Sequence, residues 1–526
     1  MSVEQHNALA DQFNFAQYVL EQNISRPNKT AYIDDNGSLT YGELDHQLRS
    51  LAAALLQQGV MRDQRVLMVL QDSRDFPITF LAAMYAGCVP VAVNTLLTVD
   101  DYIYMLEHSR AAAVVVSDAL LDTVQQAIAQ AKHKPQLIIV SGATEPQLSG
   151  MHELADLVKS TAPLAEPADT SPDDMGFWLY SSGSTGRPKG TVHTHGNPYW
   201  TAKLYGNEVL GISEDDVCFS AAKLFFAYGL GNGLTFPLCI GATVVLMAER
   251  PTPEAVFKRW VEHQPTIFFG APTGYAGMLS SPLLPSRDQL SLRLASSAGE
   301  ALPAELGERF TDHFGIEIID GIGSTEMLHI FLSNRPGKVR YGTTGWPVPG
   351  YDIKLVGDDG DSVADGDVGD LYINGPSSAL MYWANREKSN ETFRGAWTKS
   401  GDKYIRNADG SYTYSGRSDD MIKVSGIYVS PFEVEATLIQ CPAVLETAVI
   451  GVENDQGLTV TKAYIVLKEG ASAEADELKA FVKERLAPYK YPRQIEFIDE
   501  LPKTATGKIQ RFMLRKIETV RSEEKG

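Results

Sequence analysis

The sequence has few cysteines, no excess of positive charge and no long apolar run. Its four cysteines, Cys88, Cys218, Cys239 and Cys441, lie far apart and form no Cys-x-x-Cys pair, so neither a zinc site nor a disulfide framework is indicated. The formal net charge of −20 argues against a nucleic-acid-binding surface, because phosphate backbones require clustered Lys and Arg. No window contains a run of about 18 apolar residues, the length that spans a bilayer. The composition therefore predicts neither a nucleic-acid partner nor a membrane partner.

Two further absences concern targeting and chemistry. The first residues carry Glu4 and Asp11 and lack a basic segment followed by an apolar run, so no secretory signal is expected. Together with the scattered cysteines, this predicts a cytoplasmic protein, and we expect a monomer or a homodimer. A Gly-x-Ser-x-Gly motif is also missing, so a covalent serine nucleophile is not expected.

What is present is a regular alternation of helix and strand patterns. Residues 40–59 carry leucines at helical spacing behind a Thr40/Glu43 capping box, and the mainly apolar segments 65–70 and 89–93 predict buried strands. A length of 526 residues is too great for one core, so a large domain with subdomains and a smaller domain are expected. The pattern predicts an α/β fold. We expect a polar surface excursion at 141–172 and a helix from Val192 onward.

Residues 180–190 have the composition of a phosphate-binding loop. They combine three glycines, four Ser or Thr hydroxyls and two cations, Arg187 and Lys189, and contain no acid. Glycines allow backbone N–H groups to converge on an anion, and a lysine adds a point charge for a polyphosphate. The spacing does not fit a Walker loop, so an ordinary P-loop NTPase is not predicted. From composition alone, a solvated Gly/Ser linker remains the alternative.

The pattern Ser-Ser-Gly-Ser-Thr-Gly-x-Pro-Lys-Gly in this stretch resembles the nucleotide loop of the adenylate-forming superfamily. This superfamily contains acyl- and aryl-CoA synthetases, adenylation domains of peptide synthetases and beetle luciferases. Further motifs extend the resemblance over nearly the whole chain, and it is closest to benzoate–CoA ligases. The resemblance implies a large α/β N-terminal region of several subdomains, 1–417, which binds acid and ATP. It also implies a small mobile α+β C-terminal domain, 418–526.

The same resemblance implies an ATP site and a magnesium ligand. By it, Asp320 meets the adenine amino group, Thr325 the α-phosphate and Glu326 the Mg²⁺ ion; a carboxylate suits a hard cation that bridges phosphates. Asp402 would accept the ribose hydroxyls, and Arg417 would lie beside the ribose and phosphate. The implied ATP-binding residues are Ser181, Ser182, Gly183, Ser184, Thr185, Gly186, Lys189, Gly299, Glu300, Asp320, Gly321, Ile322, Ser324, Thr325, Asp402 and Arg417.

The stretch 223–232 resembles the acyl-pocket motif of the superfamily. The place beside the reacting carboxyl falls on Phe226, small Ala227 and Gly229 would leave room for a flat ring, and Tyr228 could stack on it. No Asp occurs in this stretch to hold a substrate amine, so an amino acid is not the expected substrate. A buried aromatic cluster with no ligand is the alternative. The implied pocket residues are Phe226, Ala227, Tyr228, Gly229, Ala298, Gly323, His329, Ile330 and Lys423.

The resemblance also assigns roles in the C-terminal part. Asp419 falls at the hinge of the superfamily, Ser425 and Gly426 line the path of coenzyme A, and Lys508 is the lysine of the adenylation step. Thr325, Glu326 and Lys508, with the hinge Asp419, form the expected catalytic set.

The implied reaction joins an aromatic carboxylic acid to coenzyme A at the expense of ATP, through an acyl-adenylate. A carboxylate is a poor electrophile, and adenylation gives it a leaving group, while Lys508 and Mg²⁺ offset the charge that develops. Two alternatives stay open: a ligase for hydroxybenzoate or another short acid, and a stand-alone adenylating module that performs only the first half-reaction.

Overall fold

The computed structural model describes residues 9–143, 150–183, 186–418, 420–424, 427–454, 459–486, 490–503 and 509–523. By internal contacts the chain forms two compact units. Unit 1 comprises Met1–Ile353 and Ile373–Lys399, and unit 2 comprises Lys354–Tyr372 and Ser400–Gly526.

Unit 1 contains two twisted sheets built mainly from parallel strands, as expected of an α/β fold. The first sheet has the order β19-β9-β8-β4-β3-β5-β6-β7 and becomes antiparallel at β9 and β19. Its strands are β3 (Arg65–Val69), β4 (Val89–Ala92), β5 (Ala113–Ser117), β6 (Leu137–Ser141), β7 (His152–Glu153), β8 (Met175–Gly183), β9 (Gly186–Thr194) and β19 (Met381–Tyr382).

The second sheet of unit 1 has the order β16-β15-β14-β13-β12-β10-β11-β1-β2. Its central strands are parallel, and β2, β15 and β16 run antiparallel to their neighbours. The strands are β1 (Thr30–Asp34), β2 (Gly37–Thr40), β10 (Val217–Ser220), β11 (Thr243–Val245), β12 (Ile267–Gly270), β13 (Leu294–Ser297), β14 (Ile318–Gly323), β15 (Ile330–Ser333) and β16 (Trp346–Pro347).

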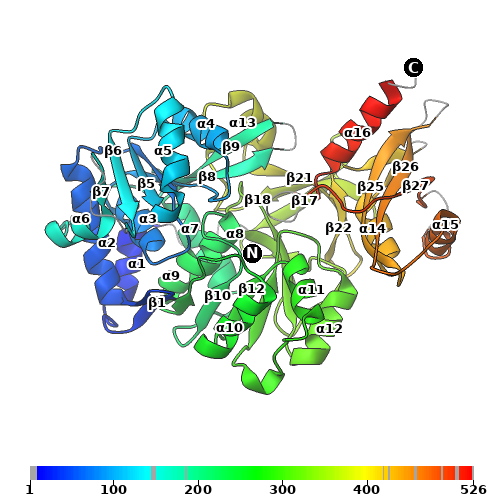
Figure 1. Cartoon of the computed structure of the whole chain (residues 1–526), viewed down its shortest axis with the longest axis horizontal. Coiled ribbons are helices and arrows are strands. Elements are labelled where there is room, and N and C mark those ends of the chain that lie inside the picture. The colour runs from blue at the N-terminus through cyan, green and yellow to red at the C-terminus, as the bar shows by residue number, and fades with distance from the viewer. Residues whose placement is uncertain are drawn as a thin grey trace. The chain divides into compact units, whose positions relative to one another are not determined.

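Strand β3 shows why helices cover both faces of a sheet. Val66 and Met68 point into one apolar cluster, whereas Leu67 and Val69 point into another, because successive side chains of a strand alternate between faces. Figure 1 shows helices around the sheets of unit 1. They are α1 (Phe15–Asn23), α2 (Tyr41–Gln57), α3 (Asp75–Tyr85), α4 (Val99–Ser109), α5 (Leu121–Gln130), α6 (Leu154–Ser160), α7 (Gly196–Thr201), α8 (Ala227–Leu230), α9 (Phe236–Ile240), α10 (Pro253–His263), α11 (Pro272–Ser280), α12 (Ala304–Phe314) and α13 (Arg386–Thr392).

The structure confirms one local prediction and corrects others. Helix α2 begins after Thr40, whose hydroxyl accepts from the Glu43 backbone N–H while the Glu43 carboxylate accepts from Thr40, as the capping box predicts. The helix expected from Val192 onward is wrong at its start, since Val192–Thr194 continue β9 and Val192 pairs with Trp178 of β8. β-Branched residues at 191, 192 and 194 favour the strand. The prediction of a surface excursion at 141–172 is wrong in part, since the segment contains β7 and α6, and Leu154, Leu157 and Val158 of α6 are buried in the core.

Unit 2 is an α+β assembly, as the sequence predicts. Strand β26 pairs antiparallel with β25 and parallel with β27. The chain passes between the units within β17 (Asp352–Val356), β18 (Val368–Asn374) and β21 (Trp397–Arg406). The other elements of unit 2 are β22 (Tyr412–Arg417), β23 (Ile422–Val424), β24 (Ile427–Val429), β25 (Val444–Glu453), β26 (Thr459–Leu467), β27 (Gln494–Phe497), α14 (Pro431–Ile439), α15 (Ala475–Lys483) and α16 (Arg511–Glu523).

Within the described ranges, every helix is too short or too polar to cross a lipid bilayer.

Candidate active site

The predicted phosphate loop is the tip of the β8–β9 hairpin. Ser181 lies opposite Lys189, and Gly183 pairs with Gly186 at the end of the ladder. The expectation that the loop follows a strand is therefore met, and a second strand follows it directly. Ser184 and Thr185 lie outside the described residues, as does the side chain of Ser182.

The carboxylate of Glu326 lies beside this hairpin. Its Oε1 accepts a hydrogen bond from the Tyr382 hydroxyl at 2.7 Å and a longer one from the Ser181 hydroxyl at 3.4 Å. The Lys189 ammonium lies 4.4 Å from the centre of the Tyr382 ring and 3.4 Å from its hydroxyl oxygen. The predicted residues Ser181, Lys189 and Glu326 thus lie around one tyrosine to which the sequence assigned no role.

His193 anchors the segment that carries Thr325 and Glu326. Its Nε2 lies 2.8 Å from the Thr325 carbonyl, which can only accept, so Nε2 carries the proton and Nδ1 accepts from the Asn197 amide at 2.8 Å. Burial lowers the pKa of His193 to about 4, which leaves the ring neutral. No local signal in the sequence connects His193 with Thr325.

Asp320 lies on β14 next to Ser297 of β13, and 5% of its surface is exposed. Burial raises its pKa well above the usual range of a carboxyl group. Its Oδ1 has no hydrogen-bond partner among the described residues. A buried oxygen without a partner can accept a hydrogen bond from a ligand, such as one from the amino group of an adenine. Nearby, Gly299 has a φ of +92°, which favours glycine, and Glu300 accepts from the Thr273 hydroxyl.

Three of the predicted acid-pocket residues lie at the start of α8, with His329 in contact with one of them. Phe226, Ala227 and Tyr228 are half-buried, and the Tyr228 hydroxyl donates to Ser296 at 3.2 Å. His329 donates from Nε2 to the Tyr228 carbonyl at 3.2 Å, and burial lowers its pKa to about 3. An aromatic and neutral environment is the result.

Two glycines of this group lie so close to backbone carbonyl groups that a side chain would not fit. A Cβ on Gly229 would lie 2.0 Å from the Lys223 carbonyl oxygen, and one on Gly323 would lie 2.6 Å from the His329 carbonyl oxygen. Gly229 is therefore required by the chain itself, whatever space it leaves for a ligand. Ala298 and Ile330 are buried.

In unit 2, Asp402 and Arg417 face each other across the β21–β22 pair. Their side chains form an ion pair with 3.1 Å between Nη1 and Oδ1, and the Asp402 side chain is nearly buried. Arg417 is the more exposed partner.

For the remaining predicted residues of unit 2, the structure describes only their neighbours in the chain. Asp419, Ser425, Gly426 and Lys508 lie outside the described residues, as does the side chain of Lys423. Val424 pairs with Ile427 on either side of 425–426, and Lys503 forms a bridge with Ile509 on either side of 504–508.

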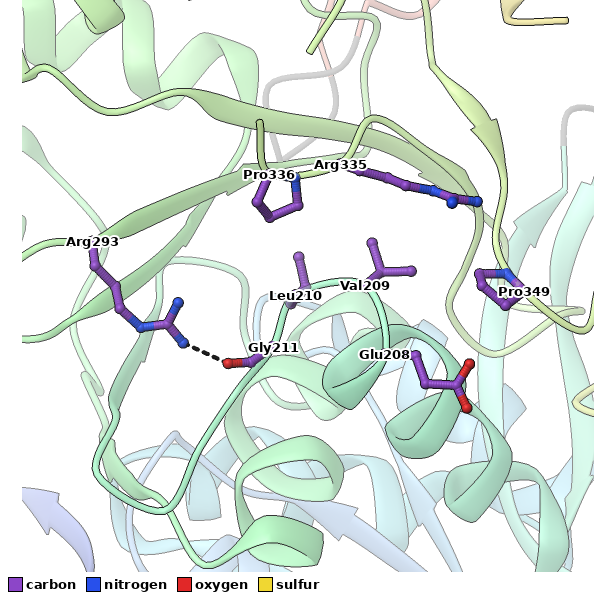
Figure 2. Close-up of a pocket in the computed structure, with 8 residues that line it drawn as sticks. All are labelled: Glu208, Val209, Leu210, Gly211, Arg293, Arg335, Pro336 and Pro349. Carbon is purple, nitrogen blue, oxygen red and sulfur yellow. Dashed lines mark hydrogen bonds between the residues drawn. The ribbon is translucent and has the colours of Figure 1, made fainter. Parts of the chain in front are cut away.

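A separate cavity of about 420 Å³ opens elsewhere in unit 1 (Figure 2). Arg293 at its edge donates to the Gly211 carbonyl and forms an ion pair with Asp216, so its charge is already offset. None of the residues predicted to bind acid or nucleotide lines it. The lining residues are Glu208, Val209, Leu210, Gly211, Arg293, Arg335, Pro336 and Pro349.

Comparison with known proteins defines the class. Residues 20–383 match the family described as AMP-binding enzyme, and residues 433–508 match the AMP-binding enzyme C-terminal domain. The chain belongs to this family of AMP-binding, adenylate-forming enzymes, which confirms the resemblance inferred from its motifs.

Two similar relatives are named for aromatic acids. The chain is 55% identical to a benzoate–CoA ligase of Thauera aromatica, with 96% of each chain covered. It is 48% identical to a 4-hydroxybenzoate–CoA/benzoate–CoA ligase of Rhodopseudomonas palustris, covering 96% of this chain and 94% of the relative.

Solved structures agree. A benzoate CoA ligase from Burkholderia xenovorans LB400 is 59% identical, with a TM-score of 0.89 over 96% of this chain and all of that one. An anthranilate CoA ligase solved with anthranoyl-AMP is 41% identical, with a TM-score of 0.93 over 99% of this chain and all of that one.

Proposed function

We propose that this protein is a benzoate–CoA ligase: benzoate, ATP and coenzyme A are converted to benzoyl-CoA, AMP and diphosphate through benzoyl-adenylate. The observation that carries the proposal is the 55% identity, over 96% of both chains, to a benzoate–CoA ligase. The enzyme is thus an AMP-forming acid–thiol ligase that uses ATP, Mg²⁺ and coenzyme A.

The surroundings of α8 support an aromatic acid. Phe226, Tyr228 and His329 offer ring surfaces, and the low pKa of His329 keeps it uncharged at neutral pH. A flat neutral ring is bound by such surfaces, whereas the amine of an amino acid would require a buried carboxylate beside it.

The nucleotide residues support the adenylation step. Ser181 and Lys189 face each other on the hairpin, where a hydroxyl and an ammonium suit phosphate oxygens, and Asp320 offers a buried acceptor to the adenine. Glu326 would hold the Mg²⁺ ion, which, when bound, offsets phosphate charge. Asp402 would accept the ribose hydroxyls, with Arg417 beside them.

We further propose that the two half-reactions use two poses of the C-terminal domain. Residues 1–417 would hold acid and ATP, and residues 418–526 would turn about Asp419. Lys508 would serve adenylate formation, and the Ser425–Gly426 segment would then admit the CoA thiol, which attacks the acyl carbon and displaces AMP. We expect the protein to work in the cytoplasm as a monomer or homodimer.

A ligase for 4-hydroxybenzoate is the second candidate, favoured by the relative that is 48% identical and named for both acids. A stand-alone adenylating enzyme is the third. AMP release from the purified protein should be measured with benzoate, 4-hydroxybenzoate, palmitate and phenylalanine, each with and without coenzyme A. The proposal requires the highest kcat/KM for benzoate and stoichiometric benzoyl-CoA. AMP release that yields no thioester would favour the adenylating enzyme.

A further inference from the structure

Asp72 is a buried carboxylate that the proposed reaction does not use. It lies in the loop between β3 and α3, and 5% of its surface is exposed. Burial raises its pKa to about 6, against the opposing effects of Lys223 and the Leu224 N–H, so the group is charged at pH 8. A buried charge is costly unless its hydrogen bonds compensate for it. Its contacts are therefore informative.

The carboxylate of Asp72 accepts a hydrogen bond from the backbone N–H of Leu224. The distances from this nitrogen are 3.2 Å to Oδ1 and 3.4 Å to Oδ2, between residues 152 positions apart in the chain. The nitrogen belongs to the same planar peptide unit as the carbonyl of Lys223. Fixing the N–H therefore also fixes the direction of that carbonyl.

The carbonyl of Lys223 contacts two residues of the acid-pocket stretch. It accepts the backbone N–H of Phe226 at 3.0 Å, and it lies so close to Gly229 that a Cβ there would be 2.0 Å away. The positions of Phe226 and Gly229 thus depend on the orientation of a single peptide unit.

The side chain of Lys223 restrains the same unit from another direction. Its ammonium donates to the carbonyls of Met247, Ala248 and Glu249, the last at 2.7 Å. The peptide unit is therefore held at its N–H by Asp72 and at its Cα by a lysine anchored to three carbonyls.

We infer that Asp72 is a positioning residue for the acid pocket: by holding the 223–224 peptide unit it sets the places of Phe226 and Gly229 and hence the fit of the acid. The inference rests on the proposed function, since it takes 226–229 as the acid pocket. Asp72 acts through the peptide unit without touching the substrate.

The test compares Michaelis constants for acid and for ATP in the full-length enzyme. Asp72→Ala leaves the Leu224 N–H unpaired and should raise KM for benzoate about 10-fold, the size expected for one buried hydrogen bond to a charge, with KM for ATP changed less than about 2-fold. Asp72→Asn keeps an acceptor of the same shape and should restore KM for benzoate to within about 3-fold of the parent. If Asp72→Ala does not fold, Asp72→Ser, too short to reach Leu224, takes its place.

Asp75 provides a matched control three residues along. Its carboxylate accepts from the Ser141 hydroxyl at 2.6 Å, and burial raises its pKa as well, but its contacts lead away from 223–229. Asp75→Ala should lower the stability of the protein, but it should not raise KM for benzoate more than KM for ATP. Equal effects of Asp72→Ala on acid and ATP, or equal effects of the two alanine variants, would overturn the inference. A parent enzyme that prefers another acid would refute the proposed function alone, and the same comparison would then be made with that acid.

Discussion

The Tyr382 hydroxyl donates a 2.7 Å hydrogen bond to Oε1 of Glu326, across 56 positions of sequence. The ring of Tyr382 packs against Phe393 and is 3% exposed, so the hydroxyl has little freedom to move. Lys189 lies over the same ring. Tyr382 is thus placed to fix the orientation of the carboxylate proposed to hold Mg²⁺.

The first prediction follows from this pair. Glu326→Gln preserves shape and removes charge, so adenylate formation should fall about 10²-fold, the order found for one charge-stabilising group. Tyr382→Phe leaves the carboxylate in place but less oriented, so it should raise the Mg²⁺ concentration for half-maximal rate several-fold and recover at saturating Mg²⁺. Benzoate-dependent ATP–pyrophosphate exchange, titrated with Mg²⁺, measures both. Unchanged exchange in Glu326→Gln would remove Glu326 from the metal site.

The second prediction concerns the size of the acid pocket. Ala227→Phe should fill the space beside Tyr228 and lower kcat/KM for benzoate by about 10²-fold, because misplacing the carboxyl by an ångström has an effect of that order. The KM for ATP should stay near the parent value. The parent enzyme should also prefer benzoate to palmitate. Comparable turnover of both acids by the parent enzyme would contradict the assignment of 226–229 as the pocket.

The third prediction separates the half-reactions. Lys508→Ala should slow adenylation about 10²-fold or more while still converting supplied benzoyl-adenylate and coenzyme A to thioester. Gly426→Leu should form adenylate and fail at the thioester step, because a side chain would obstruct the thiol. Single-turnover measurements of each half-reaction distinguish the two variants. Equal losses in both steps would refute the two-pose mechanism.

The fourth prediction concerns pH and stability. Burial lowers the pKa of His193 to about 4 in the folded protein, and an unfolded histidine titrates near 6.5. Between pH 6.5 and pH 4, His193 binds a proton in the unfolded chain but not in the folded chain. The free energy of unfolding is therefore unaffected by this histidine above pH 6.5 and decreases as the pH falls towards 4. The full loss is about 3 kcal/mol.

Urea unfolding of the parent and of His193→Gln at pH 7 and pH 5 measures this contribution. At pH 7 the variant should be less stable than the parent, because the hydrogen bonds to Thr325 and Asn197 are lost. At pH 5 the difference in free energy of unfolding between the two proteins should be smaller, because only the parent carries His193. His46→Gln, at an exposed position on α2, removes a histidine without touching His193 or its partners and serves as the control. A gap that is equal at both pH values would mean that His193 keeps an ordinary pKa.

The sequence by itself determined the elements whose signals are local. The Thr40/Glu43 pair predicted the start of α2, and the apolar residues 66–70 that follow Arg65 predicted a buried strand. The stretch that carries Ser181 and Lys189 was predicted to be a loop directly after a strand, and the structure places it after β8. These signals need only a few neighbouring residues, since helix and strand periods and caps are properties of short segments.

The tertiary structure alone decided which distant residues meet. Tyr382 reaches Glu326, His193 holds the Thr325 carbonyl, and Asp72 receives the Leu224 N–H from 152 positions away. The strand at Val192 was missed although its β-branched residues favour it, and its pairing with Trp178 of β8 appears only in the folded sheet. Such contacts depend on strand order and register, which the packing of whole sheets selects and no short segment encodes.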